Sequence, residues 1–109
     1  MKIKADFLES GFIEIGNENN IFSIAEIGLN HNNDIDLAKE MIDVAKNAGC
    51  SSVKFQNFKT EDFLKDKNIK WKDGTKKKSL FNICKKNEFK DEWFEKLIKI
   101  AKKKGKYIF

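Results

Sequence analysis

Residues 21–62 have the pattern of one complete βαβ unit, and this unit restricts the fold more than any other part of the chain. Residues 21–27 form a mostly apolar run rich in Ile and Phe, which is typical of a buried parallel strand. Residues 35–48 place apolar side chains at helical spacing, and Asp34 precedes them as the expected N-cap. Residues 52–56 form the second strand. The chain is therefore expected to be of the α/β class.

Charged and polar side chains interrupt both predicted strands near their carboxyl ends. If Val53 and Phe55 pack against the helix layer, Lys54 and Gln56 point away from it, into whatever the sheet encloses. A buried lysine without an anionic partner is unfavourable, so Lys54 requires one. Ligands of α/β sheets bind at the carboxyl ends of strands, and Glu26 has that position on the first strand. Glu26 and Lys54 are therefore a candidate ligand site on adjacent or nearby parallel strands.

The same pair also has a purely structural interpretation. Glu26 can be a solvated carboxylate at the end of a strand, with Lys54 as its salt-bridge partner and no role in catalysis. The residue pattern alone favours neither interpretation.

The loop after the first strand, residues 28–33, leaves the same end of the predicted sheet. Asn30 and His31 provide hydrogen-bond donors and acceptors there. His31 is the only histidine of the chain, so it cannot form a metal site alone. A lone loop histidine is more often a hydrogen-bonding or surface residue than a catalyst.

Further elements are expected on both sides of the βαβ unit. A strand at residues 11–15 and a polar turn predict a β-hairpin over about residues 11–26. Residues 91–104 predict a second long helix, and residues 107–109 begin a third strand. Between them, residues 57–75 are polar and lysine-rich and are expected to cover the edge of the site. Trp71 in this segment is expected to pack against the protein rather than stack on a ligand.

The charge is unevenly distributed but does not predict a nucleic-acid partner. Residues 1–60 contain 6 lysines against 9 acidic residues, whereas residues 61–109 contain 16 against 8. None of the basic residues is arginine, the residue favoured for recognising phosphates and bases, and no recognition motif accompanies the lysines. A basic nucleic-acid-binding domain remains an alternative that salt-dependent retention of DNA or RNA would reveal.

Targeting signals are not evident in the sequence. No segment approaches the ~20 apolar residues of a membrane span, and residues 1–10 lack the apolar core of a signal peptide. Cys50 and Cys84 have no metal-type spacing, so free thiols in a reducing compartment are expected. A cytoplasmic location without a membrane partner is therefore expected.

Two motifs resemble the N-terminal part of the sialic acid synthase family, the phosphoenolpyruvate-dependent nonulosonic acid synthases. They are IAEIGLNHNND at residues 24–34 and AGCSSVKFQNFKTED at residues 48–62, and the resemblance extends from about residue 12 to residue 109. The family motif usually reads N-H-x-G, whereas this chain has Asn33 in place of the glycine. Because Asn tolerates the left-handed conformation better than most residues, the turn is expected to survive.

The resemblance implies the N-terminal portion of a (β/α)8 TIM barrel preceded by the β-hairpin. Such a barrel takes about 250 residues, so the barrel is expected to be incomplete in this chain of 109 residues. The family's C-terminal antifreeze-like domain is expected to be absent from this chain. Family members are expected to be homodimers.

The resemblance also implies a reaction and roles for residues. Phosphoenolpyruvate condenses with the aldehyde of an N-acylated amino sugar, and phosphate is released. Glu26 matches an acidic residue implicated in sugar contact and proton handling, and Lys54 matches a lysine that neutralises phosphoenolpyruvate. Gln56, Asn30 and His31 are expected to shape or contact the site.

The resemblance also implies a metal ion and a class of acceptor sugar. A divalent ion, manganese or magnesium, is expected to polarise the aldehyde, with histidine ligands on later strands that this chain does not contain. The acceptor is N-acetylmannosamine or a related sugar, including those of legionaminic and pseudaminic acid synthesis. The alternative is a non-catalytic remnant or small binding module of the same fold.

Overall fold

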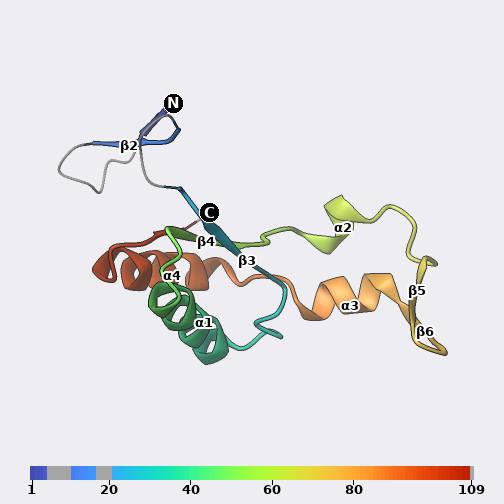
Figure 1. Cartoon of the computed structure of the whole chain (residues 1–109). Helices are drawn as coiled ribbons and strands as arrows, with labels where there is room; N and C mark the ends of the chain where they lie inside the picture. Colours follow the sequence, from blue (N-terminus) through green and yellow to red (C-terminus); the bar gives the residue numbers. More distant parts are fainter. Residues whose placement is uncertain (5–10, 17–20, 109) are drawn as a thin grey trace.

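A parallel sheet lies at the centre of the computed structural model, which describes residues 1–4, 11–16 and 21–108, except for the side chain of Tyr107. Its three strands have the order β3 (Ile24–Gly28), β4 (Ser52–Phe55) and β7 (Tyr107–Ile108) (Figure 1). The predicted α/β class is confirmed. Within the described residues the sheet is open, with β3 at one edge and β7 at the other.

Two helices of 13 residues each, α1 (Ile35–Asn47) and α4 (Asp91–Lys103), pack on the same face of this sheet. The Asp34 carboxylate caps α1, as predicted, by accepting hydrogen bonds from the second and third residues of the helix. An ion pair between Asp43 and Lys104 joins the two helices. None of the helices in the described ranges is long and apolar enough to cross a membrane.

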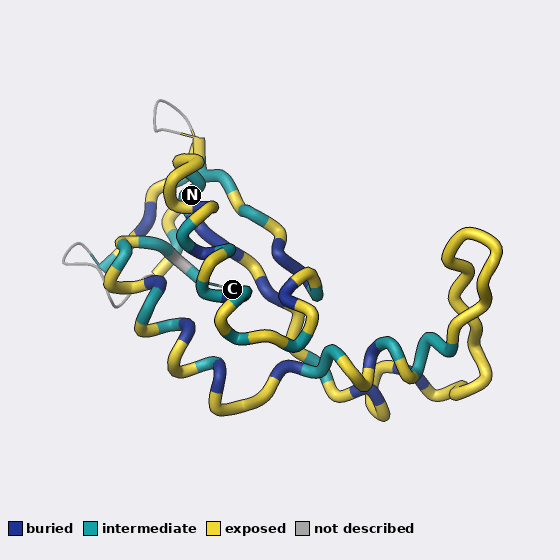
Figure 2. The backbone as a smooth tube through the Cα atoms, turned by 90° about the horizontal axis from the view of Figure 1, so that it is seen from below, coloured by how far each residue is buried: buried dark blue, intermediate teal, exposed yellow. Residues whose placement is uncertain are grey.

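The core lies between this face of the sheet and the two helices. Val53 and Phe55 of β4 are buried there, as alternation predicts, and they meet fully buried Ile42 of α1 and Leu97 of α4. The buried segments of Figure 2 follow the sheet and the inner sides of these helices. The remainder of the buried cluster comprises Ile27, Ala38, Ala45, Phe89, Trp93 and Ala101.

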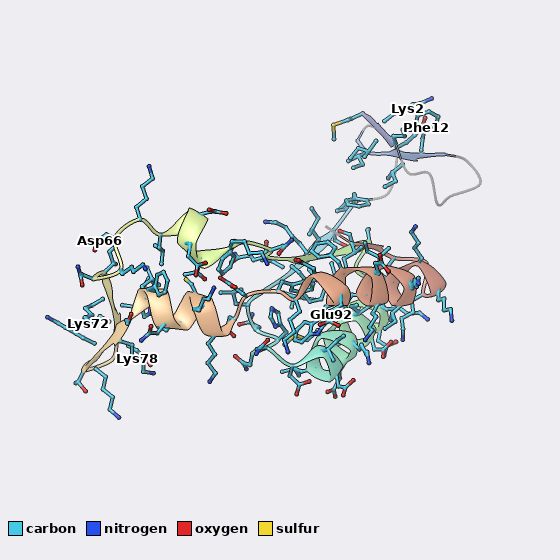
Figure 3. All side chains as sticks on the ribbon, turned by 180° about the vertical axis from the view of Figure 1, so that it is seen from behind. Lys2, Phe12, Asp66, Lys72, Lys78 and Glu92 are labelled. Carbon is cyan, nitrogen blue, oxygen red and sulfur yellow. The ribbon has the colours of Figure 1, made fainter. Side chains whose placement is uncertain are left out.

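The chain between β4 and α4 projects from the carboxyl end of the sheet as an arm, residues 57–90 (Figure 1). It contains α2 (Thr60–Phe63), the antiparallel strands β5 (Lys70–Asp73) and β6 (Lys76–Ser79), and α3 (Leu80–Lys86). In Figure 3, Lys72 and Lys78 lie at the far end of the arm, away from Glu92 of α4. Trp71 is 58% exposed, so the prediction that it packs is wrong: both strands of the hairpin project into solvent.

The hairpin at the N-terminal side differs from the prediction. Strand β2 (Phe12–Glu14) pairs antiparallel with β1 (Lys2–Lys4), not with the strand that begins the βαβ unit. An ion pair of 3.1 Å between Lys2 and Glu14 supports this pairing, and Ile3 faces Ile13 across it. The predicted hairpin over residues 11–26 is therefore corrected. Residues 17–20 of its turn lie outside the described part of the chain.

Element ends differ from the predictions by small amounts. β3 begins at residue 24 instead of 21, and Ile21 is 92% exposed. The structure ends α1 at residue 47, β4 at residue 55 and α4 at residue 103, each one residue earlier than predicted. The predicted third strand corresponds to β7, and Phe109 lies outside the described residues.

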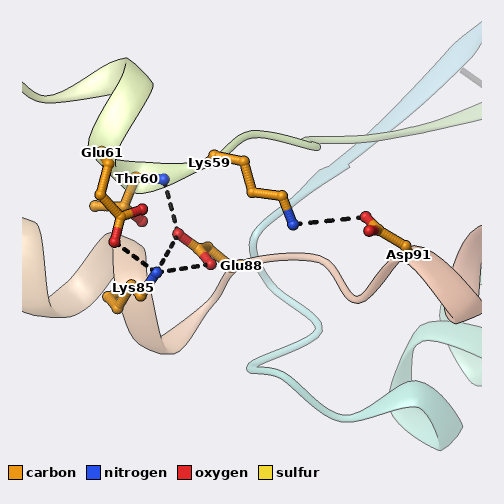
Figure 4. A network of polar contacts seen from close by, with 6 residues as sticks. All are labelled: Lys59, Thr60, Glu61, Lys85, Glu88 and Asp91. Carbon is orange, nitrogen blue, oxygen red and sulfur yellow. Dashed lines mark hydrogen bonds and ion pairs between the residues drawn. The ribbon is translucent and has the colours of Figure 1, made fainter.

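A polar network fixes the base of the arm (Figure 4). The Glu88 carboxylate accepts a hydrogen bond of 2.7 Å from the backbone N–H of Thr60, which is the first residue of α2. The N-cap residue of α2, Lys59, makes no side-chain capping hydrogen bond, and Glu88 provides the cap instead. Lys85 donates to both Glu88 and Glu61, and Lys59 pairs with Asp91 at the start of α4.

This network gives the arm a defined response to acid. The hydrogen bond from the Thr60 backbone N–H, followed by the interaction with Lys85, lowers the pKa of the Glu88 carboxyl from 4.5 to about 2. A lowered carboxyl pKa in the folded state contributes stability above the unfolded value, and this contribution is lost as pH falls from 4.5 towards 2.

We therefore expect Glu88→Gln to lower the free energy of unfolding at pH 6 more than at pH 2.5. Urea unfolding at the two pH values measures this difference. Glu92→Gln, on an exposed residue of α4, is the matched control and should show little change at either pH. An equal loss for Glu88→Gln at both pH values would contradict the assignment.

Candidate functional site

An ion pair between neighbouring strands is the centre of the candidate site. Glu26 and Lys54 are direct partners in the parallel register of β3 and β4. The Lys54 Nζ donates to the Glu26 Oε2 at 2.7 Å. Both side chains are about half exposed, 49% for Glu26 and 50% for Lys54, on the face of the sheet opposite the helices. The predicted pairing on adjacent strands is thus found.

A break in the strand register shapes the end of β3. The pairing shifts between Glu26 and Gly28, so that Gly28 lies opposite Phe55. Gly28 has φ +56°, a conformation that glycine adopts without strain. A Cβ placed on Gly28 would lie 3.7 Å from the Glu26 Oε1 and 3.9 Å from the Gln56 Nε2. Glu26 and Gln56 therefore converge on the backbone of this glycine, which the sequence analysis did not assign to the site.

Asn30 reaches the same region from the loop that follows β3. Together with Glu26 it lines a groove of about 490 Å³ along the open edge of β3 and the side of α1. The rest of the lining is apolar and consists of Ala25, Ile27, Met41, Val44, Ala45, Ala48 and Cys50. Glu26 is the only charged residue of this lining. A second hollow of about 500 Å³ lies on the arm and contains none of the predicted site residues.

His31 is not brought to the ion pair. Its side chain is fully buried and packs against Phe55, Phe89 and Trp93, on the helix side of the sheet. Its Nδ1 accepts a hydrogen bond of 3.1 Å from the backbone N–H of Asn33. Burial lowers the pKa of His31 from its ordinary value of 6.5, so the ring is neutral at pH 7. In this position the imidazole cannot touch a ligand bound at Lys54.

The described residues do not provide a metal centre. Across residues 1–4, 11–16 and 21–108, no group of three or more His, Cys, Asp or Glu side chains is placed to hold an ion. The oxygens of Glu26 face a lysine, whose positive charge opposes a cation at the same carboxylate.

The arrangement combines a compact positive charge with a carboxylate and a primary amide. The Lys54 ammonium can neutralise a carboxylate or phosphate, and the Glu26 carboxylate can accept a hydrogen bond or a proton from a hydroxyl. Because both groups are half exposed, a ligand reaches them from the open face of the sheet. Gln56 can add a donor and an acceptor beside them.

If the pair serves a ligand, its loss should have little effect on folding. Half-exposed ion pairs contribute about 1 kcal/mol or less. We expect Glu26→Gln and Lys54→Met each to change the free energy of unfolding by no more than about 1 kcal/mol. Urea unfolding measures the change, with Lys39→Met, which breaks the exposed pair of Lys39 with Asp36, as the control. A loss of several kcal/mol would favour a structural role.

The sequence of this chain is similar to those of a known protein family. The sequence model of the NeuB family matches residues 41–109. The protein MJ1065 of Methanocaldococcus jannaschii, which is uncharacterised, is 38% identical over 91 residues, 84% of this chain and 24% of that protein. The N,N'-diacetyllegionaminic acid synthase of Legionella pneumophila is 47% identical over 49 residues, 45% of this chain and 14% of that enzyme.

A solved structure shares the fold as well as the sequence. The crystal structure of the N-acetylneuraminic acid synthetase of Leptospira borgpetersenii, in complex with citrate, superposes with a TM-score of 0.76 at 31% identity. The match covers 99% of this chain and 33% of the synthetase. The chain therefore spans about a third of that structure and about a quarter or less of the two relatives above.

Proposed function

Because the chain belongs to the NeuB family, we propose that it forms the N-terminal part of the TIM barrel of a nonulosonic acid synthase. The reaction condenses phosphoenolpyruvate with the aldehyde of an N-acylated amino sugar, adds water and releases phosphate. The observation that supports this proposal most is the Glu26–Lys54 pair of 2.7 Å at the carboxyl end of two adjacent parallel strands. Ligands of TIM barrels bind at that end.

We assign Lys54 to the anionic substrate. Phosphoenolpyruvate has a carboxylate and a phosphate, and a lysine ammonium is a compact charge that binds either. In the open sheet the ammonium is half exposed. In a closed barrel the surrounding strands would exclude water, and the attraction would then be stronger than at an exposed surface.

We assign Glu26 to the sugar. The new carbon–carbon bond joins the methylene carbon of phosphoenolpyruvate to the aldehyde carbon, and the aldehyde oxygen gains a proton. A carboxylate beside this centre can accept hydrogen bonds from sugar hydroxyls and exchange protons with them. Gln56 lies beside Gly28, next to Glu26, and Asn30 lines the adjoining groove together with Glu26. Both residues would orient the acceptor.

Some parts of the proposed enzyme lie outside this site. A manganese or magnesium ion would polarise the aldehyde, held by residues that are not among those described here. The acceptor is proposed only as an N-acylated amino sugar, since the relatives include synthases named for different acids. The second substrate is phosphoenolpyruvate, and a homodimer is the proposed assembly.

Replacement of Lys54 in the full-length protein tests the proposal. Lys54→Ala removes the charge that binds the anion, so we expect the KM for phosphoenolpyruvate to rise at least about tenfold, the equivalent of one charged hydrogen bond. Phosphate release in the presence of an N-acylated amino sugar measures the rate. Lys39→Ala, which removes another ion-paired lysine on α1, is the control and should leave the KM unchanged.

Two outcomes would oppose the proposal. An unchanged KM in Lys54→Ala would remove Lys54 from the substrate site. Binding of phosphoenolpyruvate by the full-length protein without any product would favour the non-catalytic binding module instead.

A further inference from the structure

The histidine of the loop after β3 has contacts that suggest a role other than substrate binding. Its ring centroid lies 5.5 Å from that of Phe89 and 5.9 Å from that of Trp93, both in edge-to-face geometry. The ring of Phe55 is 6.2 Å away. These residues come from the base of the arm, from α4 and from β4. The His31 ring is thus enclosed by three separate segments of the core.

We propose that His31 is a positioning residue, which holds the loop of residues 29–34 in the conformation that presents Asn30 beside Glu26. Its consequence for catalysis rests on the function proposed above. The conformational part concerns only this loop and can be tested without any substrate.

The loop has a conformation that needs support. Asn32 and Asn33 have φ angles of +50° and +60°, so two consecutive residues with side chains adopt the left-handed region. Asparagine tolerates that region better than most residues with side chains, but as single residues rather than two in succession. His31 closes this turn with two groups: its Nδ1 accepts from the Asn33 N–H at 3.1 Å, and its carbonyl accepts from the Asp34 N–H at 2.9 Å.

The same turn connects the aromatic contacts to the candidate site. On one side, the Asn30 N–H donates to the Ile27 carbonyl at 3.0 Å, and Asn30 lines the groove together with Glu26. On the other side, Asp34 begins α1 with its side-chain cap. A buried His31 ring therefore fixes the turn relative to β4 and α4, and the turn fixes Asn30.

The hydrogen bond defines the protonation state that the loop needs. Because Nδ1 accepts, the neutral ring has its proton on Nε2, which is buried and has no hydrogen-bond partner among the described residues. Protonation of Nδ1 would place two N–H groups against each other and break the bond to Asn33. Burial lowers the pKa of His31, which keeps the acceptor available at neutral pH.

The charged residues on the elements around the His31 ring interact with other partners. On the loop and α1, the Asp34 carboxylate accepts the capping hydrogen bonds. On the arm, Glu88 is bound by Thr60 and Lys85. At α4, the Lys90 ammonium lies 5.4 Å from the Trp93 ring centroid, and Asp91 pairs with Lys59. On β4, Lys54 projects from the opposite face.

Hydrogen exchange in the full-length protein tests the conformational part. His31→Leu fills the pocket without an acceptor, whereas His31→Asn places a side-chain oxygen near the position of Nδ1. We expect the amide of Asn33 to exchange about tenfold faster in His31→Leu, as the loss of one hydrogen bond predicts, and to stay protected in His31→Asn. In the wild type, exchange corrected for its intrinsic pH dependence should accelerate as pH falls below 6.5, and His31→Asn should lack this acceleration.

A double-mutant cycle tests the catalytic part. If His31 acts through Asn30, His31→Leu and Asn30→Ala should each lower kcat/KM by a similar factor, and the double variant should be no worse than Asn30→Ala. His31→Asn should restore most of the loss. Any decrease in kcat/KM at acidic pH that comes from protonation of His31 should be absent from His31→Asn.

The results separate the inference from the proposed function. Equal Asn33 exchange in the wild type and His31→Leu would overturn the positioning role, and so would additive losses in the cycle. If His31→Leu does not fold, the pH dependence of exchange in the wild type and His31→Asn decides the question. If the exchange pattern is as expected but the protein makes no condensation product, His31 positions the loop and the proposed enzymatic function is wrong.

Discussion

The parallel register of β3 and β4 determines both the packing of the core and the position of the candidate site. Strand alternation sends Val53 and Phe55 to one face, where α1 and α4 bury them, and sends Lys54 to the other. The same register sets Glu26 opposite Lys54 at hydrogen-bond distance. A shift by one residue would bury the lysine under the helices and expose Val53. The same register is therefore needed to pack the core and to form the site.

The site depends on the helix side of the sheet although its polar groups face the other side. His31 links the two, because its ring belongs to the core while its Nδ1 and carbonyl close the turn next to Asn30. The two ends of the arm lie close together, because Glu88 near the end of the arm caps α2 near its start. The next residue, Phe89, contacts the His31 ring. Packing on the helix side of the sheet thereby helps to orient the polar groups of the site on the other side.

Local signals explain what could be predicted from the sequence. The Asp34 cap and the alternation that separates Lys54 from the helix face are properties of neighbouring residues. The partner of β2 was predicted wrongly because pairing between strands of three residues is set by contacts distant in sequence. The direction of His31 depends on two left-handed residues after it and on Phe89 and Trp93, about sixty positions later. No local pattern contains that information.

A crystal structure of the full-length protein with phosphoenolpyruvate would show whether Lys54 and Glu26 form the substrate site of a synthase. We expect a carboxylate or phosphate oxygen about 2.7–2.9 Å from the Lys54 Nζ, on the face of the sheet opposite α1 and α4. We also expect Glu26 and Gln56 to border the space beside the methylene carbon. Phosphoenolpyruvate bound elsewhere, with the Lys54–Glu26 pair unchanged, would contradict the account and leave the pair a structural one.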